Sequence, residues 1–178
     1  LAGLKIRVME SPVNIATYEA QGCTPTPMAF NELYTGLQQG TVAGQDNGVV
    51  LTYTSRLYEV QSYYSFIGQI YAPNAIVVSE AFWQTLPEDL QQVVLDGSLY
   101  AMENQRELNT QMEDELLQEM VDAGYLEVNY VEGEALEAFK EATLPVWEQF
   151  KEEIDPEIYD MAVAIRDSAD SASGSTTD

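Results

Sequence analysis

Histidine is absent from this sequence of 178 residues, and cysteine occurs only once, as Cys23. Without histidine, the Cys–His and Ser–His pairs that activate catalytic nucleophiles cannot form. Zinc sites built from histidine and cysteine clusters are excluded as well, and a lone cysteine cannot form a disulfide within the chain. Cys23 lies between Gly22 and the turn-like residues 24–27, a poor setting for a catalytic thiol. We therefore expect no metal site and no histidine-assisted nucleophilic catalysis.

Basic residues are also scarce, with 7 Lys and Arg against 30 Asp and Glu, which gives a formal net charge of −23 at pH 7. Such a field repels nucleic acids and anionic membrane surfaces, so neither is expected as a partner. The acidic surface is interpreted either as a solubility device suited to a salty habitat or as a surface for a basic partner. An anionic ligand would need a local cation to overcome this field.

No stretch of the sequence is long and apolar enough to cross a bilayer, so we expect no direct membrane insertion. The N-terminus also lacks the pattern of a secretion signal, in which a basic region precedes an apolar run and a cleavage site. The sequence begins with Leu1 rather than Met. We therefore expect a processed chain or a piece of a longer one, with any secretion signal upstream.

Strand and helix patterns alternate along the chain, which is typical of an α/β layer built from βαβ-like units. Short extended segments are expected at residues 4–8, 41–47, 67–70, 75–79 and 125–131. Helices are expected at residues 12–21, 30–39, 87–123, 134–153 (bent at Pro145) and from 156 to about 166, with a helix that leads into a strand at 51–65.

The longest expected element is the helix over residues 87–123. It begins with Pro87, Glu88 and Asp89, and both proline and acidic residues are favoured in the first turn of a helix. At about 1.5 Å per residue, it would be about 50 Å long. That length suits a strut between two lobes. Gly97 is its interior breaker, and two helices broken near this glycine are the alternative.

Pairs of acidic residues provide the enzyme hypothesis, with Glu113 beside Asp114 and Glu152 beside Glu153. Adjacent residues on a helix point in different directions, so these carboxylates are poor general acid–base couples. A run of charges on a helix is usually a solvated face. We therefore expect that the protein is not an enzyme.

Four short motifs occur in order: Leu-Lys-Ile-Arg-Val at 4–8, Pro-Thr-Pro-Met-Ala-Phe at 25–30, Gly-Gln-Asp-Asn at 44–47, and Phe-Trp at 82–83 followed by Leu-Pro-Glu-Asp-Leu-Gln at 86–91. Together they resemble the signature of the solute-binding proteins of TRAP (tripartite ATP-independent periplasmic) transporters, the DctP-type family. In that family a GLKIRV strand leads to PTPMAFSELYTALQTG, then to DGQEN and FWDSLPEDLQ. The resemblance covers nearly the whole chain apart from its C-terminal tail.

The resemblance implies a role for several residues. In the family the strand arginine, here Arg7, forms a salt bridge with the substrate carboxylate, and the planar donor fork of a guanidinium matches a carboxylate well. Asn47 is implied to donate to the same carboxylate, and Phe30 to pack near the bound ligand. The positions at which family members vary their ligand contacts correspond to Glu10, Gln69 and Tyr71.

Alternatives remain for the two clearest candidates, and one motif departs from the family. On the residues alone, Arg7 is also interpreted as a surface charge on an edge strand, and Phe30 as an ordinary core residue. In the DGQEN motif, Ala43 replaces the first Asp and Asp46 replaces Glu. Gly48 stands where a proline often follows, so the loop is expected to be set differently.

The fold implied by the resemblance is an α/β, periplasmic-binding-protein-like (type II) fold of two lobes. Family members have about a hundred further residues before the strand that carries the arginine, a total that fits one two-lobed protein. We therefore expect mostly the second lobe here, formed by residues 1–72 and 113–166. Residues 73–112 would be a crossing segment of the first lobe that includes the start of the long helix. Residues 167–178, which are rich in Ser, Ala, Asp and Thr, would be a disordered tail.

The function implied is the capture of a small organic carboxylate in the periplasm, without a cofactor. The expected ligands are a dicarboxylate, keto acid, sugar acid or related compatible solute, bound in a cleft that closes by a hinge motion. The partners implied are this ligand and the TRAP membrane permease subunits. Two alternatives stay open: a ligand-sensing periplasmic module for a receptor, and a truncated fragment that does not bind.

Overall fold

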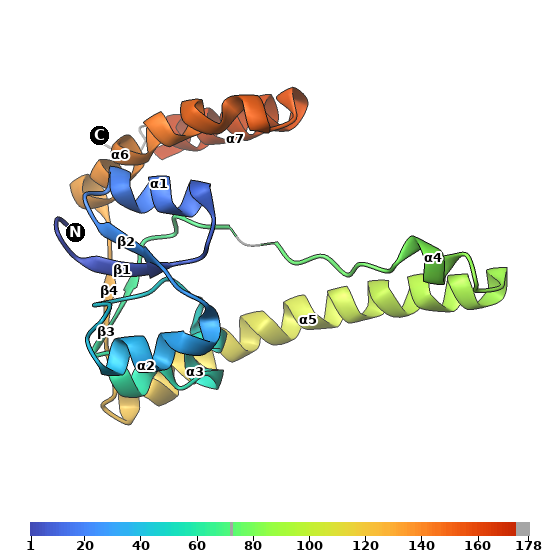
Figure 1. The fold of residues 1–178 in the computed structure, drawn as a ribbon, viewed down its shortest axis with the longest axis horizontal. Helices are drawn as coiled ribbons and strands as arrows, with labels where there is room; N and C mark the ends of the chain where they lie inside the picture. Colours follow the sequence, from blue (N-terminus) through green and yellow to red (C-terminus); the bar gives the residue numbers. More distant parts are fainter. Residues whose placement is uncertain (72, 174–178) are drawn as a thin grey trace. The chain divides into compact units, whose positions relative to one another are not determined.

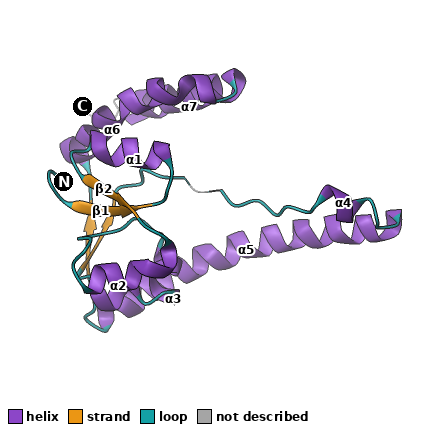
Figure 2. Ribbon diagram, viewed as in Figure 1, coloured by secondary structure: helices purple, strands orange, loops and turns teal. Residues whose placement is uncertain are grey.

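The computed structural model describes residues 1–71 and 73–173, in which short strands alternate with helices as predicted (Figures 1 and 2). The strands are β1 (Lys5–Val8), β2 (Thr24–Pro27), β3 (Tyr63–Phe66) and β4 (Glu127–Tyr130). The α-helices are α1 (Pro12–Ala20), α2 (Leu33–Gln38), α3 (Val49–Thr54), α4 (Glu80–Trp83), α5 (Glu88–Asp122), α6 (Gly133–Phe150) and α7 (Pro156–Ser173). Single 3-10 turns lie at Phe30–Glu32, Leu57–Val60 and Lys151–Glu153. None of the helices in the described residues has the length and apolar character needed to cross a bilayer.

The chain divides into two compact units, which are described separately. The first comprises Leu1–Gln45 and Glu132–Asp178, and the second comprises Asp46–Val131. This division follows contacts within the chain. The predicted division into residues 1–72 with 113–166 and residues 73–112 concerns the lobes of a longer protein, and it stays a prediction.

In the first unit, β1 is hydrogen-bonded along both of its edges. It pairs in parallel with β2, in a register that places Arg7 opposite Thr26. On its other edge, the Ala43 backbone N–H donates to the Lys5 carbonyl at 2.7 Å, and the Arg7 N–H donates to the Gly44 carbonyl at 2.8 Å. The strand is therefore central, and its side chains are enclosed more than those of an edge strand.

Helix α1 covers the β1–β2 pair and also packs against α6 (Figure 1). Pro12 occupies its first turn, where the missing N–H costs nothing. The helix ends at Ala20, and Gly22, two residues beyond it, has a φ of +82°, which is accessible to glycine at little cost. Tyr18 of this helix forms a buried cluster with Val8 of β1 and with Cys23. The βαβ arrangement predicted from the sequence is therefore present in this unit.

The second unit is built around the parallel pair of β3 and β4, with α3 packed against α5. Its core contains the buried Val49, Met120 and Leu126, with several half-buried tyrosines around them. The aromatic-rich stretch at 51–65 does contain a helix that leads into a strand, as predicted. This unit therefore has a hydrophobic core of its own.

Helix α5 is one continuous helix of 35 residues, so the alternative of two helices broken near Gly97 is wrong. Its C-terminus has a glycine-based cap, in which Gly124 has a φ of +75°. The Tyr125 N–H donates to the Met120 carbonyl at 3.0 Å, and the Gly124 N–H donates to the Val121 carbonyl at 2.9 Å. These two bonds satisfy carbonyls that have no partner within a helix end.

Several local predictions are wrong. Residues 67–70 and 75–79 form no strand, and Ile76 and Val77 are 62% and 84% exposed. Both segments are apolar, but a strand also needs a hydrogen-bonding neighbour, and the described residues provide none for them. The helix expected at 30–39 begins as a 3-10 turn and becomes α-helical only at Leu33.

The end of the chain also differs from the prediction. Helix α7 continues to Ser173, whereas the polar composition predicted that it fades near Arg166 and gives way to a disordered tail over residues 167–178. Extending an existing helix requires only one residue to be fixed per hydrogen bond, and the tail contains alanines that favour this extension. The remaining residues of the predicted tail, 174–178, lie outside the described residues.

Candidate functional site

Arg7 lies in the middle of the first unit and is only 5% exposed. All seven basic residues of the chain lie in the described part, and Arg7 is the one among them that is buried. Because β1 is hydrogen-bonded on both edges, the interpretation of Arg7 as a surface charge on an edge strand is wrong. Burying a guanidinium is costly unless polar groups or an anion compensate its charge.

Two neighbouring groups orient the Arg7 side chain. Its Nε donates a hydrogen bond to the Met28 carbonyl at 2.9 Å. Its Cζ lies 5.8 Å from the centroid of the Phe30 ring, within the range of a cation–π contact. Both contacts are made by uncharged groups, and they orient the guanidinium.

Met28 and Phe30 reach this position because of the segment that follows β2. The Met28 N–H donates to the Val8 carbonyl at 3.2 Å, which extends the pairing of β1 and β2 by one residue. A Cβ placed on Gly36 of α2 would lie 2.9 Å from the Met28 sulfur, so a glycine here allows the helix to approach. Phe30 is 41% exposed, which contradicts its interpretation as an ordinary core residue. Phe30 therefore contacts Arg7 while part of the residue remains exposed to solvent.

Asn47 belongs to the second unit, where it immediately precedes Gly48 and helix α3. It is half-buried, and its backbone carbonyl accepts a hydrogen bond of 3.1 Å from the Tyr64 hydroxyl on β3. Burial raises the pKa of Tyr64 to about 12, with added contributions from the Glu113 and Asp46 carboxylates. The Tyr64 hydroxyl therefore keeps its proton at any physiological pH and remains a donor.

The other three predicted site residues are less closely tied to this arrangement. Glu10 is exposed at a bend just after β1. Gln69 is half-buried in the segment that follows β3, and Tyr71, in the same segment, is 91% exposed. The structure therefore brings Arg7 and Phe30 into contact, and it places Asn47, Gln69 and Tyr71 in the second unit. The assignment of these residues to a ligand stays a prediction.

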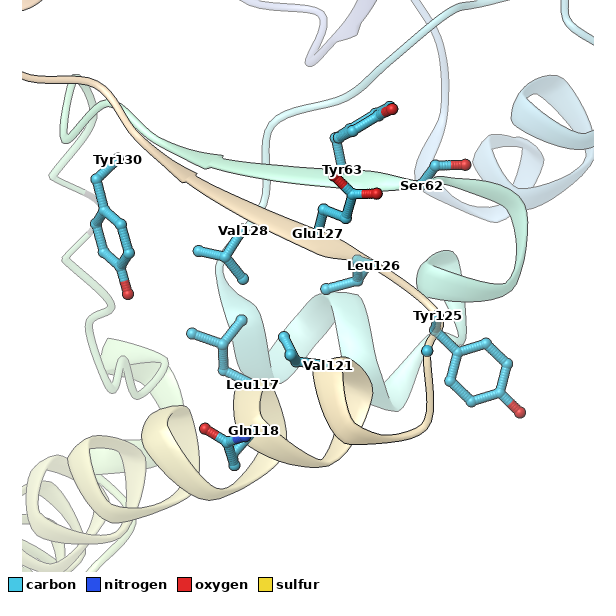
Figure 3. Close-up of a pocket in the computed structure, with 11 residues that line it drawn as sticks. Ser62, Tyr63, Leu117, Gln118, Val121, Tyr125, Leu126, Glu127, Val128 and Tyr130 are labelled. Atoms are coloured by element: carbon cyan, nitrogen blue, oxygen red, sulfur yellow. The ribbon is translucent and has the colours of Figure 1, made fainter.

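A hollow of about 880 Å³ lies elsewhere in the second unit, between β4 and the C-terminal part of α5 (Figure 3). Leu117 and Val121 of α5 and Leu126 and Val128 of the strand segment face each other across it. It is lined by none of the six residues that the sequence singled out. Its walls are mainly aliphatic and tyrosine side chains, which suit packing better than the recognition of an anion.

The groups that could support catalysis or hold a metal are poorly placed for it. Glu113, Asp114, Glu152 and Glu153 are all exposed, as expected for solvated helix faces. Cys23 is buried, and burial raises the pKa of its thiol, which disfavours the reactive thiolate. Within the described residues, no group of three or more His, Cys, Asp or Glu side chains is arranged to hold a metal ion.

Two contacts of the candidate residues, one in each unit, were missed by sequence reasoning. The Met28 carbonyl holds Arg7, and the Tyr64 hydroxyl holds the Asn47 backbone. Both are bonds to backbone carbonyls from residues at least 17 positions away. The only signals in the sequence were that Met28 lies inside a recognised motif and that Tyr64 lies in a tyrosine-rich stretch.

Comparison with known proteins reveals similar sequences and similar solved structures. The chain is 33% identical over 124 residues to the 2,3-diketo-L-gulonate-binding periplasmic protein of Escherichia coli, an alignment that covers 70% of this chain and 38% of the relative. A TRAP periplasmic solute-binding protein from Shewanella oneidensis, solved with bound succinate, has a TM-score of 0.82 at 27% identity, covering 92% of this chain and 53% of that one. The periplasmic ectoine-binding protein of the TeaABC TRAP transporter of Halomonas elongata has a TM-score of 0.84 at 32% identity. This alignment covers 89% of the present chain and 53% of the ectoine-binding protein.

These likenesses confirm the expected fold, the two-lobed fold of TRAP periplasmic binding proteins, of which the chain represents a part. The chain spans about half the length of the solved relatives, 53% of each, and 38% of the E. coli protein. The family described as bacterial extracellular solute-binding protein, family 7 (DctP), matches residues 1–153. The chain therefore belongs to the DctP-type family of bacterial extracellular solute-binding proteins, as the four sequence motifs predicted.

Proposed function

We propose that this chain provides the carboxylate-binding part of an extracytoplasmic solute-binding protein, which captures a small organic acid for a TRAP-type secondary transporter. The observation that carries the proposal is Arg7, a cation buried on the central strand β1 and oriented by the Met28 carbonyl and the Phe30 ring. The family is one of solute-binding proteins and not of enzymes. Capture without chemical change is therefore the function proposed.

The chemistry of Arg7 favours a carboxylate as ligand. Its Nε already donates to a carbonyl, and this bond fixes the plane in which the remaining N–H groups of the guanidinium lie. A planar cation of fixed orientation recognises a planar carboxylate better than a flexible ammonium group does. Hydrogen bonds to charged groups contribute about 1.5–3 kcal/mol each, more than bonds between neutral groups.

The relatives support the same class of ligand. The E. coli relative is named for binding 2,3-diketo-L-gulonate, and the Shewanella oneidensis structure contains succinate. The Halomonas elongata protein is named for binding ectoine. All three molecules carry a carboxylate, although the rest of each molecule differs. An arginine that binds the carboxylate, combined with variable contacts to the rest of the ligand, would account for this pattern.

The remaining parts of the proposal follow from family membership. The ligand would be met by Arg7 and Phe30, with Asn47 as a second donor to its carboxylate and Glu10, Gln69 and Tyr71 as contacts that tune specificity. The partners proposed are the membrane permease subunits of a TRAP transporter, and the location proposed is the periplasm, where the named relatives act. No cofactor is needed for this function.

Binding to the chain is tested with a panel of acids: succinate, 2,3-diketo-L-gulonate, D-galacturonate, D-erythronate and ectoine. Thermal unfolding is followed by circular dichroism with each compound in turn. A ligand at about 100 times its dissociation constant stabilises the folded chain by about 2.7 kcal/mol. For a chain of this size, that corresponds to a rise of about 5–10 °C in Tm.

Substitution of Arg7 tests whether this side chain binds the acid. In Arg7→Ala we expect the affinity to fall at least about 30-fold, because removing one partner of a buried charge pair costs about 2–5 kcal/mol. Arg106→Ala, which removes an exposed arginine from α5, is the matched control and is expected to bind normally. Equal affinity in Arg7→Ala and Arg106→Ala would refute the role of Arg7, and no shift with any acid would refute binding by this chain.

A further inference from the structure

The strand β3 contributes one side chain that contacts the loop carrying Asn47. The Tyr64 hydroxyl donates to the Asn47 carbonyl at 3.1 Å, a bond between residues 17 positions apart within the second unit. The ring of Tyr64 lies 4.9 Å from that of Phe66, centroid to centroid, and packs against the buried cluster around Val49. The hydroxyl is therefore presented by a rigid, packed ring.

We propose that Tyr64 is a positioning residue that orients Asn47 toward the carboxylate of the bound acid. This inference rests on the proposed function, because it gives Asn47 the part of a ligand donor. Tyr64 itself does not touch the ligand. Its hydroxyl holds the peptide carbonyl of Asn47, and this bond restricts the backbone torsion that sets the direction of the side-chain amide.

The local sequence explains why such a restraint is needed. Asn47 lies between Gly44 and Gly48, and glycines leave a backbone with more conformations than other residues do. Gly48 has φ −66° and ψ 164°, and a Cβ placed on it would meet nothing within 4 Å. Neither sterics nor packing of Gly48 therefore fixes the loop on that side.

A second restraint begins just beyond the glycine. Val49, the first residue of α3, is 3% exposed and belongs to the same cluster that Tyr64 packs against. The loop is thus tied to one core at two points, through the Val49 side chain and through the Tyr64 hydroxyl. A high pKa, about 12, keeps the hydroxyl protonated, so this restraint persists across the physiological pH range.

The experiment is a double-mutant cycle on ligand affinity, measured by calorimetry with the acid of the panel that raises Tm most. Tyr64→Phe removes only the hydroxyl and is expected to weaken binding about 3- to 10-fold, the equivalent of one neutral hydrogen bond. Asn47→Ala removes the donor amide but keeps the backbone carbonyl that Tyr64 bonds. If Tyr64 acts through the Asn47 side chain, the effect of Tyr64→Phe falls below about 2-fold in the Asn47→Ala background.

Two further variants separate positioning from general stability. Tyr53→Phe is the matched control, because it removes a hydroxyl in the same unit that is bonded at 2.7 Å to Glu119, and we expect unchanged affinity. Gly48→Ser narrows the freedom of the loop by another route and is expected to restore part of the affinity of Tyr64→Phe. This recovery of affinity tests the positioning role independently of the double-mutant cycle between Tyr64 and Asn47.

The outcomes are distinguishable. Coupling between Tyr64 and Asn47, with rescue by Gly48→Ser, supports the inference. An unchanged affinity in Tyr64→Phe overturns it, as does an equal loss in both backgrounds, and in either case wild-type binding and the proposed function stand. If no acid of the panel binds the wild-type chain, the proposed function fails first and the role of Tyr64 falls with it.

Discussion

Gly97 allows a direct test of whether α5, the longest helix of the second unit, is continuous. It lies ten residues inside the helix, is exposed, and a Cβ placed on it would meet no atom within 4 Å. Alanine is favoured over glycine in a helix interior by about 0.8–1.0 kcal/mol, because it loses less backbone entropy on folding. We therefore expect Gly97→Ala to stabilise the chain by about that amount and to raise Tm by about 2–4 °C.

A Cβ added at Gly124, 27 residues after Gly97, should destabilise the chain instead. Gly124 has a φ of +75°, and a Cβ placed there also meets no atom within 4 Å. Any cost of Gly124→Ala is therefore backbone strain, and a left-handed conformation costs about 1–2 kcal/mol for a residue with a Cβ. We expect Gly124→Ala to lower the free energy of unfolding by about 1 kcal/mol.

The assay is urea unfolding followed by circular dichroism at 222 nm for the wild type and the two variants. Opposite signs of similar size are expected, with unchanged dependence of the unfolding free energy on urea. A neutral or destabilising Gly97→Ala would refute the reasoning, since it would mean that the helix is interrupted at Gly97 or that the residue is covered. That result would restore the interpretation of two shorter helices.

Two further predictions concern titration and charge. The pKa of Tyr64 is raised above its ordinary value of 10 to about 12, so its contribution to stability is fully present below pH 10 and is lost as the pH rises toward 12. In urea unfolding at increasing pH, Tyr64→Phe should lose less stability between pH 10 and pH 12 than the wild type. An identical loss in both proteins would contradict this prediction. With a net charge of −23, the carboxylates of the folded chain repel one another. Raising NaCl from about 10 mM to about 150 mM shortens the Debye length from about 30 Å to about 8 Å. This screening should weaken the repulsion and raise Tm. A Tm that is flat or falls over this range would show that the carboxylates are too far apart to interact.

Most of the helices and strands could be predicted because local signals determined them. Pro87 and two acidic residues marked the start of α5, and glycines at 22 and 124 marked the ends of α1 and α5. The segments at 67–70 and 75–79 could not be judged in this way. Their apolar residues are those of strands, but whether a strand forms depends on a distant neighbour that the local sequence does not specify.

The candidate site shows the same limit. Motifs singled out Arg7 and Phe30, and the structure places their side chains in contact. In each unit, the bond that holds a candidate residue ends on a backbone carbonyl, at Met28 in the first and at Asn47 in the second. Because every residue has a carbonyl, its use as an acceptor leaves no trace in residue type. Only the donors, Arg7 and Tyr64, could have been recognised, and only one of them lay in a familiar motif.

The strongly acidic composition does not conflict with an anionic ligand, because the two act over different distances. At physiological ionic strength, charges on the surface are screened beyond about 8 Å. Arg7 is 5% exposed, and the attraction between a cation and an anion strengthens several-fold where water is excluded. A buried guanidinium can therefore attract an anion even in a chain whose net charge is strongly negative. Under the proposed function, the net charge would govern solubility and the approach of the acid, whereas Arg7 would govern its recognition.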